Sequence, residues 1–238
     1  MKKTTIELGQ MSYAMTEELK TLRTNISFCG EDKQVIMVTS SLSGEGKTET
    51  SLKLAYSLTE LKKKVLLIDT DLRKSVMISR AKATGVDNGL THFLAGQCTL
   101  ADVVMSTNIP RLHMVFAGPQ APNPTELLST ERFKGMIESA RTVYDYIIID
   151  APPLGLVVDA AIISEQCDGS ILVVESGEVK RKLVQSVKEK LEVASCPILG
   201  VVLNKVDRKK NGHYYGKYYG KAYGKQYGKY YGNSKEDK

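Results

Sequence analysis

The sequence has 238 residues, of which 42% are hydrophobic and 25% are charged, and its formal net charge is +6 at pH 7. This length and composition predict one folded domain, alone or with a tail, and can supply a substantial core. The sequence has no long uncharged apolar stretch, and no apolar segment follows its first lysines, so we expect no transmembrane span and no signal peptide. The four cysteines are widely spaced, which predicts reduced thiols in a cytoplasmic protein, without a disulfide framework or a zinc site.

Residues 12–28 carry apolar side chains at helical spacing, which predicts an amphipathic helix within an N-terminal segment, residues 1–33. These apolar residues are Met15, Leu19, Leu22 and Ile26. Glu17, Lys20 and Arg23 lie on the polar side of this helix. From the spacing alone, we expect a helix that packs on the domain and exposes its polar side.

Residues 39–48 read TSSLSGEGKT and lie between two regular segments. The apolar run 35–38 predicts a buried strand, and residues 49–61 predict a helix. A strand, a glycine-rich loop that ends in Lys-Thr and a helix together form the geometry of a phosphate-binding loop.

Four residues of this loop have defined roles in phosphate binding. Gly44 and Gly46 let the backbone N–H groups approach an anion closely. Lys47 is placed to reach the β- and γ-phosphates, and the Thr48 hydroxyl is placed to bind Mg²⁺. One position departs from the pattern, because Ser41 stands where the motif has its first glycine.

Two further apolar runs end in aspartates. Asp69 and Asp71 follow the run 65–68, and Asp150 follows the run 146–149. The carboxyl ends of parallel strands lie at one edge of a sheet, so we expect these acids on the same rim as the phosphate loop. Carboxylates at that rim are typical ligands of the Mg²⁺ used in phosphoryl transfer.

The remaining elements alternate between helices and strands. We expect short helices at 89–94 and 100–104, a strand at 112–116, a helix from Pro124 to about Ala140 with Asn123 as its N-cap, a helix at 157–165, a strand at 170–174, a helix at 179–193 and a strand at 198–203. This order predicts an α/β fold like that of P-loop NTPases: a doubly wound, mostly parallel sheet with helices on both faces, over residues 34–207.

Residues 208–238 form a low-complexity tail with a net charge of +7, whereas the rest of the chain carries −1. Glycine recurs at every fourth position from Gly212 to Gly232, and lysine keeps the same period from Lys217 to Lys229. Such a composition predicts a disordered segment. The tail holds these tyrosines: Tyr214, Tyr215, Tyr218, Tyr219, Tyr223, Tyr227, Tyr230 and Tyr231.

The tail tyrosines are the expected phosphoryl acceptors. A phenol has a pKa of about 10, so it must lose its proton as it attacks a phosphate. Asp69 or Asp71 is a candidate for accepting that proton or for orienting the hydroxyl. A carboxylate that coordinates Mg²⁺ is a weak base, so we expect the two roles to fall on different residues.

The three acid- and glycine-bearing stretches resemble motifs of the bacterial tyrosine kinases, which control capsular and exopolysaccharide synthesis. Residues 39–48 are similar to the Walker A motif of that family, 66–73 to Walker A′ and 147–153 to Walker B. Residues 117–128 are similar to another segment of the family, and the tyrosine-rich tail is similar to its autophosphorylation cluster. The signatures of eukaryotic-type kinases are absent from the sequence.

The resemblance implies a set of site residues for ATP and Mg²⁺. Catalysis is assigned to Lys47, Asp69 and Asp71, with Asp69 as a candidate base. ATP binding is assigned to Ser43, Gly44, Glu45, Gly46, Lys47, Thr48, Glu49 and Asn204, and Mg²⁺ binding to Thr48, Asp69, Asp71 and Asp150.

The resemblance also implies partners. Glu17, Lys20 and Arg23 match a helix motif used in ring-like self-association, although Lys20 replaces its first arginine and lacks the bidentate fork. Family members without membrane spans work with a separate transmembrane activator of the polysaccharide co-polymerase type. We therefore expect recruitment to the inner face of the membrane, tyrosine-bearing protein substrates and no nucleic acid.

Three alternatives remain open from the sequence. A partition or site-placement ATPase would share the fold, but its signature lysine would fall at Leu42. A GTPase would use the N-K-x-D pattern at 204–207, but this short motif follows a strand and can instead border an adenine. A non-enzymatic reading treats the Tyr/Gly/Lys repeat as an RNA-binding or adhesive segment.

Overall fold

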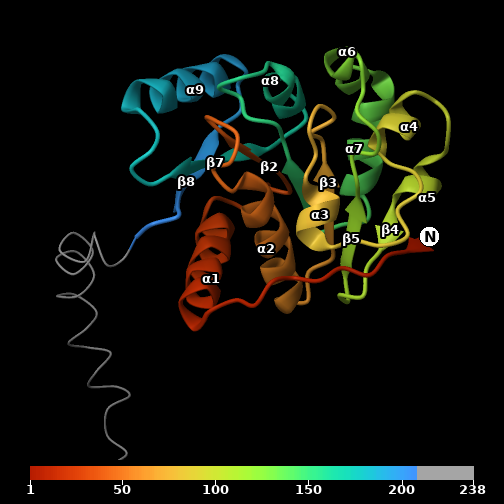
Figure 1. Ribbon diagram of the computed structural model, residues 1–238, viewed down its shortest axis with the longest axis horizontal. Helices are drawn as coiled ribbons and strands as arrows, with labels where there is room; N and C mark the ends of the chain where they lie inside the picture. Colours follow the sequence, from red (N-terminus) through yellow and green to blue (C-terminus); the bar gives the residue numbers. More distant parts are fainter. Residues whose placement is uncertain (208–238) are drawn as a thin grey trace, which may run out of the picture. The chain divides into compact units, whose positions relative to one another are not determined.

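A single sheet of eight strands forms the centre of residues Met1–Asn204 in this computed structural model, which describes residues 1–207 (Figure 1). The strands are β1 (Lys2–Lys3), β2 (Val35–Ser40), β3 (Val65–Asp69), β4 (Met105–Ser106), β5 (Leu112–Val115), β6 (Tyr146–Asp150), β7 (Gly169–Glu175) and β8 (Ile198–Asn204). Their order across the sheet is β1-β4-β5-β3-β6-β2-β7-β8. Neighbouring strands are parallel except for β4 and β5, which are antiparallel.

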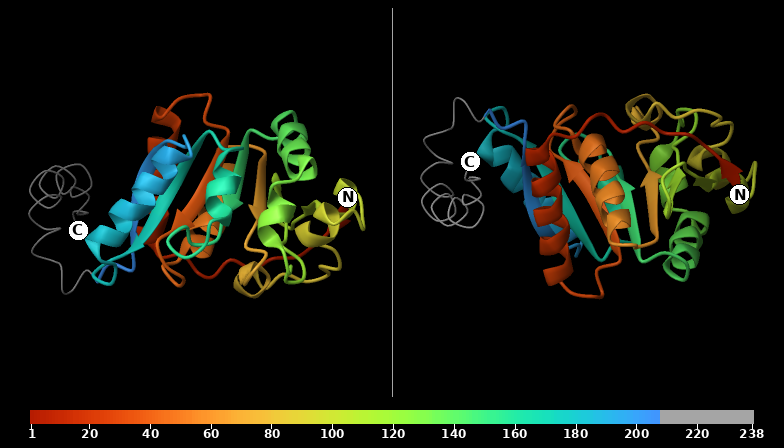
Figure 2. Two further views of the ribbon diagram at one scale, coloured as in Figure 1. Left: turned by 90° about the horizontal axis from the view of Figure 1, so that it is seen from above. Right: turned by 90° about the horizontal axis from the view of Figure 1, so that it is seen from below.

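Helices cover both faces of this sheet. The helices are α1 (Tyr13–Phe28), α2 (Lys47–Glu60), α3 (Met77–Ala81), α4 (Leu90–Leu94), α5 (Leu100–Val103), α6 (Pro124–Leu128), α7 (Glu131–Arg141), α8 (Asp159–Ser164) and α9 (Arg181–Val193). Figure 2 shows α1 and α2 side by side over one face, and α8 and α9 over the other.

Each face of the sheet has its own hydrophobic core, because the side chains of a strand alternate between the two faces. In β2, Ile36 and Val38 pack into the core beneath α1 and α2, whereas Val35 and Met37 pack into the core beneath α6–α9. All four side chains are fully buried. Burial on both faces explains why the central strands are apolar throughout rather than alternating.

The predicted α/β fold with a mostly parallel sheet is confirmed, but one predicted helix is wrong. The segment expected to be one helix from Pro124 to Ala140 is two helices, α6 and α7. Thr130 separates them with an extended backbone (φ −75°, ψ 151°), and its hydroxyl accepts a hydrogen bond from the Phe133 N–H. Thr130 is therefore an N-cap that begins a new helix. Asn123 precedes α6, but its side chain makes no capping hydrogen bond.

The sheet topology positions the functional site. Strands β3, β6 and β2 are neighbours, and the register pairs Asp69 with Asp150 and Val38 with Asp150. The carboxyl ends of these three strands therefore form one rim, next to the loop that leads into α2. Within residues 1–207, no helix has the length and apolar character that a membrane crossing requires.

The eight tail tyrosines lie outside the described residues. The chain divides into a unit Met1–Asn204 and a unit Lys205–Lys238, and the structure describes only residues 205–207 of the second unit. The division at 33/34 and 207/208 therefore stays a prediction from the sequence.

Candidate active site

The loop between β2 and α2 has the backbone that a phosphate cradle requires. Gly44 and Gly46 have φ angles of +88° and +94°, a left-handed conformation that L side chains rarely adopt. A Cβ on Gly44 would meet no atom within 4 Å, whereas a Cβ on Gly46 would overlap the Asn204 side chain. The backbone angle therefore favours glycine at position 46, and any larger residue would also displace the Asn204 amide.

Glu45 and Asn204 hold this loop in place. The buried Glu45 carboxylate accepts hydrogen bonds from the N–H groups of Leu42 (2.5 Å) and Glu175 (3.0 Å). The Glu45 carbonyl accepts a hydrogen bond from Asn204 Nδ2 at 2.8 Å. Both residues were assigned to ATP binding from the sequence. In the structure, their side chains connect the phosphate loop to the carboxyl ends of β7 and β8.

Lys47 lies at the centre of the rim. Its Nζ is 3.2 Å from Asp71 Oδ2 and 4.0 Å from Asp150 Oδ1, and all three side chains are at most 10% exposed. Burial alone would lower the pKa of Lys47, but the carboxylates of Asp150 and Asp71 outweigh it, so the net shift is upward. The ammonium therefore stays charged where a phosphate would need a cation.

Burial shifts the pKa values of Asp69 and Asp150 upward. Burial, and then the nearby Asp150 charge, raises the pKa of Asp69 to about 7. Burial also raises the pKa of Asp150, although Lys47 and the hydroxyls of Thr48 and Ser51 counteract this effect. Both oxygens of Asp69 are engaged, because Ser75 Oγ donates to one and the Asp71 N–H donates to the other at 3.1 Å.

The oxygen donors at the rim fit a magnesium–nucleotide complex better than a metal cage made by protein alone. Thr48 lies buried in the first turn of α2, and Ser51 Oγ donates to Asp150 Oδ1 at 3.1 Å. Within residues 1–207, no three acidic, histidine or cysteine side chains converge to hold a metal ion by themselves. Mg²⁺ usually keeps several waters and binds one or two carboxylates plus substrate phosphates, which is what this donor set offers.

Two other residues assigned to ATP binding lie at the edge of the site. Ser43 is exposed at the tip of the loop. The Glu49 carboxylate forms an ion pair with Lys53 one turn further along α2, at 2.9 Å. Ser41, in the position of the first motif glycine, is fully buried, and its hydroxyl has no hydrogen-bond partner among the described residues.

The three residues assigned to self-association do not share one environment. Lys20 and Glu17 form an exposed ion pair within α1 at 2.8 Å. Arg23 is mostly buried and connects α1 to α2, because its guanidinium donates to the Ser57 carbonyl at 2.7 Å and pairs with Glu60 at 3.0 Å. Arg23 therefore has an intramolecular role that the helical spacing did not reveal.

The structure adds an ion pair at the end of the segment 66–73. Arg73 donates to Asp159 from Nε (2.5 Å) and from Nη2 (2.9 Å), and Thr125 Oγ1 donates to the same carboxylate at 2.8 Å. Asp159 is 1% exposed, so it is a buried anion that joins the segment after β3 to α6 and α8. Arg73 therefore pairs with a carboxylate of the folded protein itself.

The strand–loop–helix cradle and the acids at the neighbouring strand ends define a P-loop nucleotide-binding protein. A sequence model described as AAA domain matches residues 33–191. Tyrosine-protein kinase CpsD of Streptococcus agalactiae serotype III (strain NEM316) is 49% identical over 193 residues, which cover 81% of this chain and 83% of that protein. Tyrosine-protein kinase YwqD of Bacillus subtilis (strain 168) is 36% identical over 218 residues, 90% of this chain and 91% of that protein.

Solved structures agree with this relationship. The chimerical protein CapA2B2 has a TM-score of 0.79 and 29% identity, and the match covers 87% of this chain and 94% of that chain. The septum site-determining protein MinD complexed with Mg-ADP, from Pyrococcus horikoshii OT3, has a TM-score of 0.63 and 26% identity, over 74% of this chain and 71% of that chain. The chain belongs to the bacterial tyrosine-protein kinase family, as the resemblance of its motifs predicted.

Proposed function

We propose that this protein is an ATP-dependent protein-tyrosine kinase that phosphorylates the tyrosines of its own C-terminal tail, in trans between copies. The observation that carries the proposal is the meeting of Lys47 with Asp71 and Asp150 beside the phosphate loop. The identity to named tyrosine-protein kinases over most of the chain supports the reaction class. The 24 residues from 208 to 231 span at most about 80 Å when extended, so the tyrosines can reach the site of a neighbour.

In this proposal the loop and Lys47 bind the triphosphate of ATP. The loop N–H groups and the N-terminus of α2 hold the phosphates, and Lys47 supplies the cation. Of the four residues assigned to Mg²⁺ from the sequence, Thr48, Asp69 and Asp150 would hold the ion, and Asp71 is left for proton transfer. When bound, Mg²⁺ would neutralise charge on the β- and γ-phosphates. Binding of the phosphates draws Lys47 toward them and frees an oxygen of Asp71.

The freed carboxylate of Asp71 is placed to accept the phenolic proton. Asp69 is 1% exposed and both of its oxygens are engaged, whereas Asp71 is 8% exposed. A bond then forms between the phenolic oxygen and the γ-phosphorus, and the bond from this phosphorus to the bridging oxygen of ADP breaks. The phenolic proton passes to Asp71, and Asp69 positions Asp71 by accepting its N–H.

The cellular setting is part of the same proposal and follows from the family resemblance. The kinase regulates capsular or exopolysaccharide synthesis and export. It is cytoplasmic and is recruited to the inner face of the membrane by a transmembrane activator of the polysaccharide co-polymerase type. It forms ring-like homo-oligomers when unphosphorylated, and it acts on other proteins through their tyrosines, with no nucleic acid partner.

The test is incubation of the purified full chain with ATP labelled in the γ-phosphate and Mg²⁺, with and without a cytoplasmic activator segment, followed by phosphosite mapping. We expect label on tyrosines of residues 214–231, which Lys47→Met abolishes. Lys53→Met is the matched control, because Lys53 lies on the same helix but pairs with Glu49. A chain with phenylalanine at the tail tyrosines should incorporate no label there.

One structural neighbour favours a second candidate, an ATPase switch of the partition or site-placement type. The MinD structure aligns over 74% of this chain. Leu42 occupies the position of the signature lysine of that class and cannot donate to a phosphate, which weighs against the candidate. Label released only as inorganic phosphate, with none on tyrosine, would support the ATPase and contradict the kinase.

A further inference from the structure

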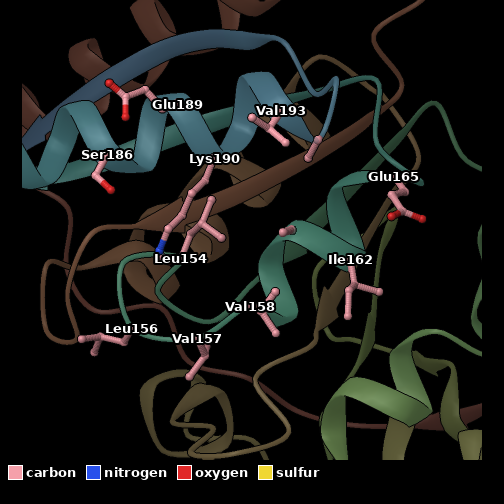
Figure 3. A pocket seen from close by; sticks show the side chains of 12 residues that line it. Leu154, Leu156, Val157, Val158, Ile162, Glu165, Ser186, Glu189, Lys190 and Val193 are labelled. Atoms are coloured by element: carbon pink, nitrogen blue, oxygen red, sulfur yellow. Dashed lines mark hydrogen bonds between the residues drawn. The ribbon is translucent and has the colours of Figure 1, made fainter.

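An apolar groove of about 660 Å³ lies between α8, α9 and the loop 154–158 that follows β6 (Figure 3). Its lining is mainly aliphatic: Leu154, Leu156, Val157, Val158, Ile162 and Val193. Three of these side chains are strongly exposed, with 57% for Leu156, 57% for Val158 and 86% for Val193. An exposed aliphatic groove of this kind is typical of a binding surface.

The groove begins at the active-site rim. Leu154 follows the Walker B strand β6, and its N–H donates to Thr39 Oγ1, in the strand that leads into the phosphate loop, at 3.3 Å. Lys190 of α9 donates to the Leu154 carbonyl at 3.2 Å, and Figure 3 shows its side chain reaching from α9 toward this loop. A segment bound along the groove would therefore end close to the phosphate-binding residues.

The rim of the groove carries two carboxylates with no ion-pair partner within residues 1–207. Glu165 follows α8, and Glu189 lies on α9. Lys190 is the cation among the lining residues, and its ammonium is directed to the Leu154 carbonyl. The groove therefore fits a segment that presents apolar or aromatic side chains together with positive charge.

We propose that this groove is a docking site for the Tyr-Gly-Lys repeat, residues 212–232, of a second copy of the chain. The inference rests on the proposed function and gives the kinase a substrate-binding surface outside its catalytic residues. Tyrosine rings would pack on the aliphatic wall, lysines would face Glu165 and Glu189, and glycine at every fourth position would allow a close backbone approach. A segment of 31 residues with a net charge of +7 lies beyond the described structure, and its chemistry matches this surface.

The regular period of the repeat would let a docked tail present a tyrosine to the active site. Because the tyrosines recur with the same spacing, one repeat can occupy the groove while another tyrosine reaches the rim. Each phosphate then adds about −1.5 to −2 charge at pH 7, so a phosphorylated repeat is repelled by the same two carboxylates. The groove therefore favours the unmodified tail and releases the product.

The test measures binding without catalysis. The full chain with all eight tail tyrosines changed to alanine, so that its own tail does not compete, is titrated against a fluorescent peptide of residues 212–232 in the absence of ATP. We expect saturable binding that Val158→Asp weakens at least tenfold and that Val143→Asp leaves unchanged. Val143 is the matched control, because it is a 49% exposed valine outside the groove.

Two further measurements examine the charge of the groove. Glu165→Lys combined with Glu189→Lys should weaken binding at least fivefold, and these exposed substitutions leave the core intact. A peptide phosphorylated on its tyrosines should bind at least tenfold more weakly than the unmodified peptide. Equal affinity of the Val158→Asp and Val143→Asp proteins, or no binding of the peptide at all, would overturn the docking site.

Failure of this inference is distinguishable from failure of the proposed function. If the wild-type chain phosphorylates its tail and the Val158→Asp chain does so at the same rate, the proposed function is supported and the docking site is refuted. If Val158→Asp weakens peptide binding but the wild-type chain phosphorylates no tyrosine, the docking site is supported and the kinase function is refuted.

Discussion

At the scale of single residues, the positive charge of one lysine lies among three buried acids. Lys47 contacts Asp71 and lies 4.0 Å from Asp150, whereas Asp69 is held by Ser75 and by the Asp71 N–H. This arrangement is costly for folding, because burial disfavours the ionised acids. It suits a site that receives a metal ion and a triphosphate, and such sites commonly trade stability for function.

The raised pKa of Asp69 predicts a stability that depends on pH. The folded pKa of about 7 lies above the unfolded value of about 3.9, so the contribution of Asp69 to stability is fully present below about pH 4 and is lost as the pH rises through 7. Asp69→Asn keeps the shape and removes the titration. We expect it to raise the free energy of unfolding by roughly 1–3 kcal/mol at pH 8, with no gain at pH 4, and to abolish phosphorylation.

Thermal unfolding from pH 4 to pH 8, without nucleotide or Mg²⁺, measures this effect. Asp87→Asn serves as the control, because Asp87 is exposed and pairs with Lys2 at the surface. An Asp69→Asn protein with the same pH profile as the wild type would show that Asp69 is ionised at no cost in the folded state.

The buried hydroxyl of Ser41 gives a second prediction at this scale. Ser41 Oγ has no hydrogen-bond partner among the described residues, whereas Ser40 Oγ donates to the Leu42 carbonyl at 2.7 Å. Removing an unsatisfied polar group is neutral or stabilising, and removing a bonded one costs stability. Urea unfolding should show Ser41→Ala at or up to about 1 kcal/mol above the wild type and Ser40→Ala about 1 kcal/mol below it. The opposite ranking would mean that Ser41 has a partner in solution.

At the scale of elements, Asp168 fixes the amino-terminal ends of two strands. Its carboxylate accepts from the N–H groups of Gln34 (2.9 Å) and Val35 (2.6 Å) at the start of β2, and from both Nη atoms of Arg141 at 2.8 Å. Burial would raise the pKa of Asp168, but Arg141 and these N–H groups outweigh it and lower the pKa. One side chain thus joins α7, β2 and the segment before β7.

These hydrogen bonds of the Asp168 carboxylate predict a contribution to stability that is lost in acid. Because the folded pKa of Asp168 is depressed, its contribution is present above the unfolded value of about 3.9 and is lost as the pH falls through the folded value. Asp168→Asn should lower the free energy of unfolding by about 1–3 kcal/mol at pH 7 and flatten the acid limb. Arg141→Lys keeps the positive charge but loses the bidentate guanidinium, so its free energy of unfolding at pH 7 should lie between those of the wild type and Asp168→Asn. Unfolding measured from pH 3 to pH 7 would contradict this role if Asp168→Asn matched the wild type throughout.

The central strands were predictable because burial on both faces of the sheet is the one condition that determines their sequences. The runs 35–38, 65–68 and 147–149 are buried on both faces, so they are apolar at every position, and the polar residues that follow them mark the rim. This is why the positions of Asp69 and Asp150 at one rim followed from the sequence.

Other features depend on contacts between distant segments. The two-residue strands β1 and β4 exist because they pair with each other and β4 with β5, and no local pattern announces them. Glu45 holds the phosphate loop only because the end of β7 presents the Glu175 N–H. The N-cap at Thr130 did have a local signal, a threonine followed by a charged helix start, which the single-helix prediction overlooked.

At the scale of the whole molecule, charge is divided unevenly along the chain. Residues 208–238 carry +7 and the remainder carries −1. Phosphorylation of four tail tyrosines adds about −6 to −8 at pH 7, which offsets the positive charge of the tail, and further phosphates reverse its sign. A positive tail favours contact with the slightly acidic remainder of another copy, and a negative tail opposes it.

We therefore expect self-association to weaken at least tenfold once the tail is phosphorylated, with its salt dependence reversed in sign. Sedimentation at about 0.05 M and about 0.5 M salt would compare three full-length proteins after incubation with ATP and Mg²⁺.

The Lys47→Met chain stays unphosphorylated and should associate more strongly at low salt, as should a chain with phenylalanine at the tail tyrosines. The phosphorylated wild type should dissociate, and more so at low salt, because less screening leaves its repulsion stronger. Equal association of the phosphorylated wild type and the phenylalanine chain would show that tail charge does not control assembly, and it would place the control in contacts of the folded unit such as the exposed Lys20 and Glu17 pair.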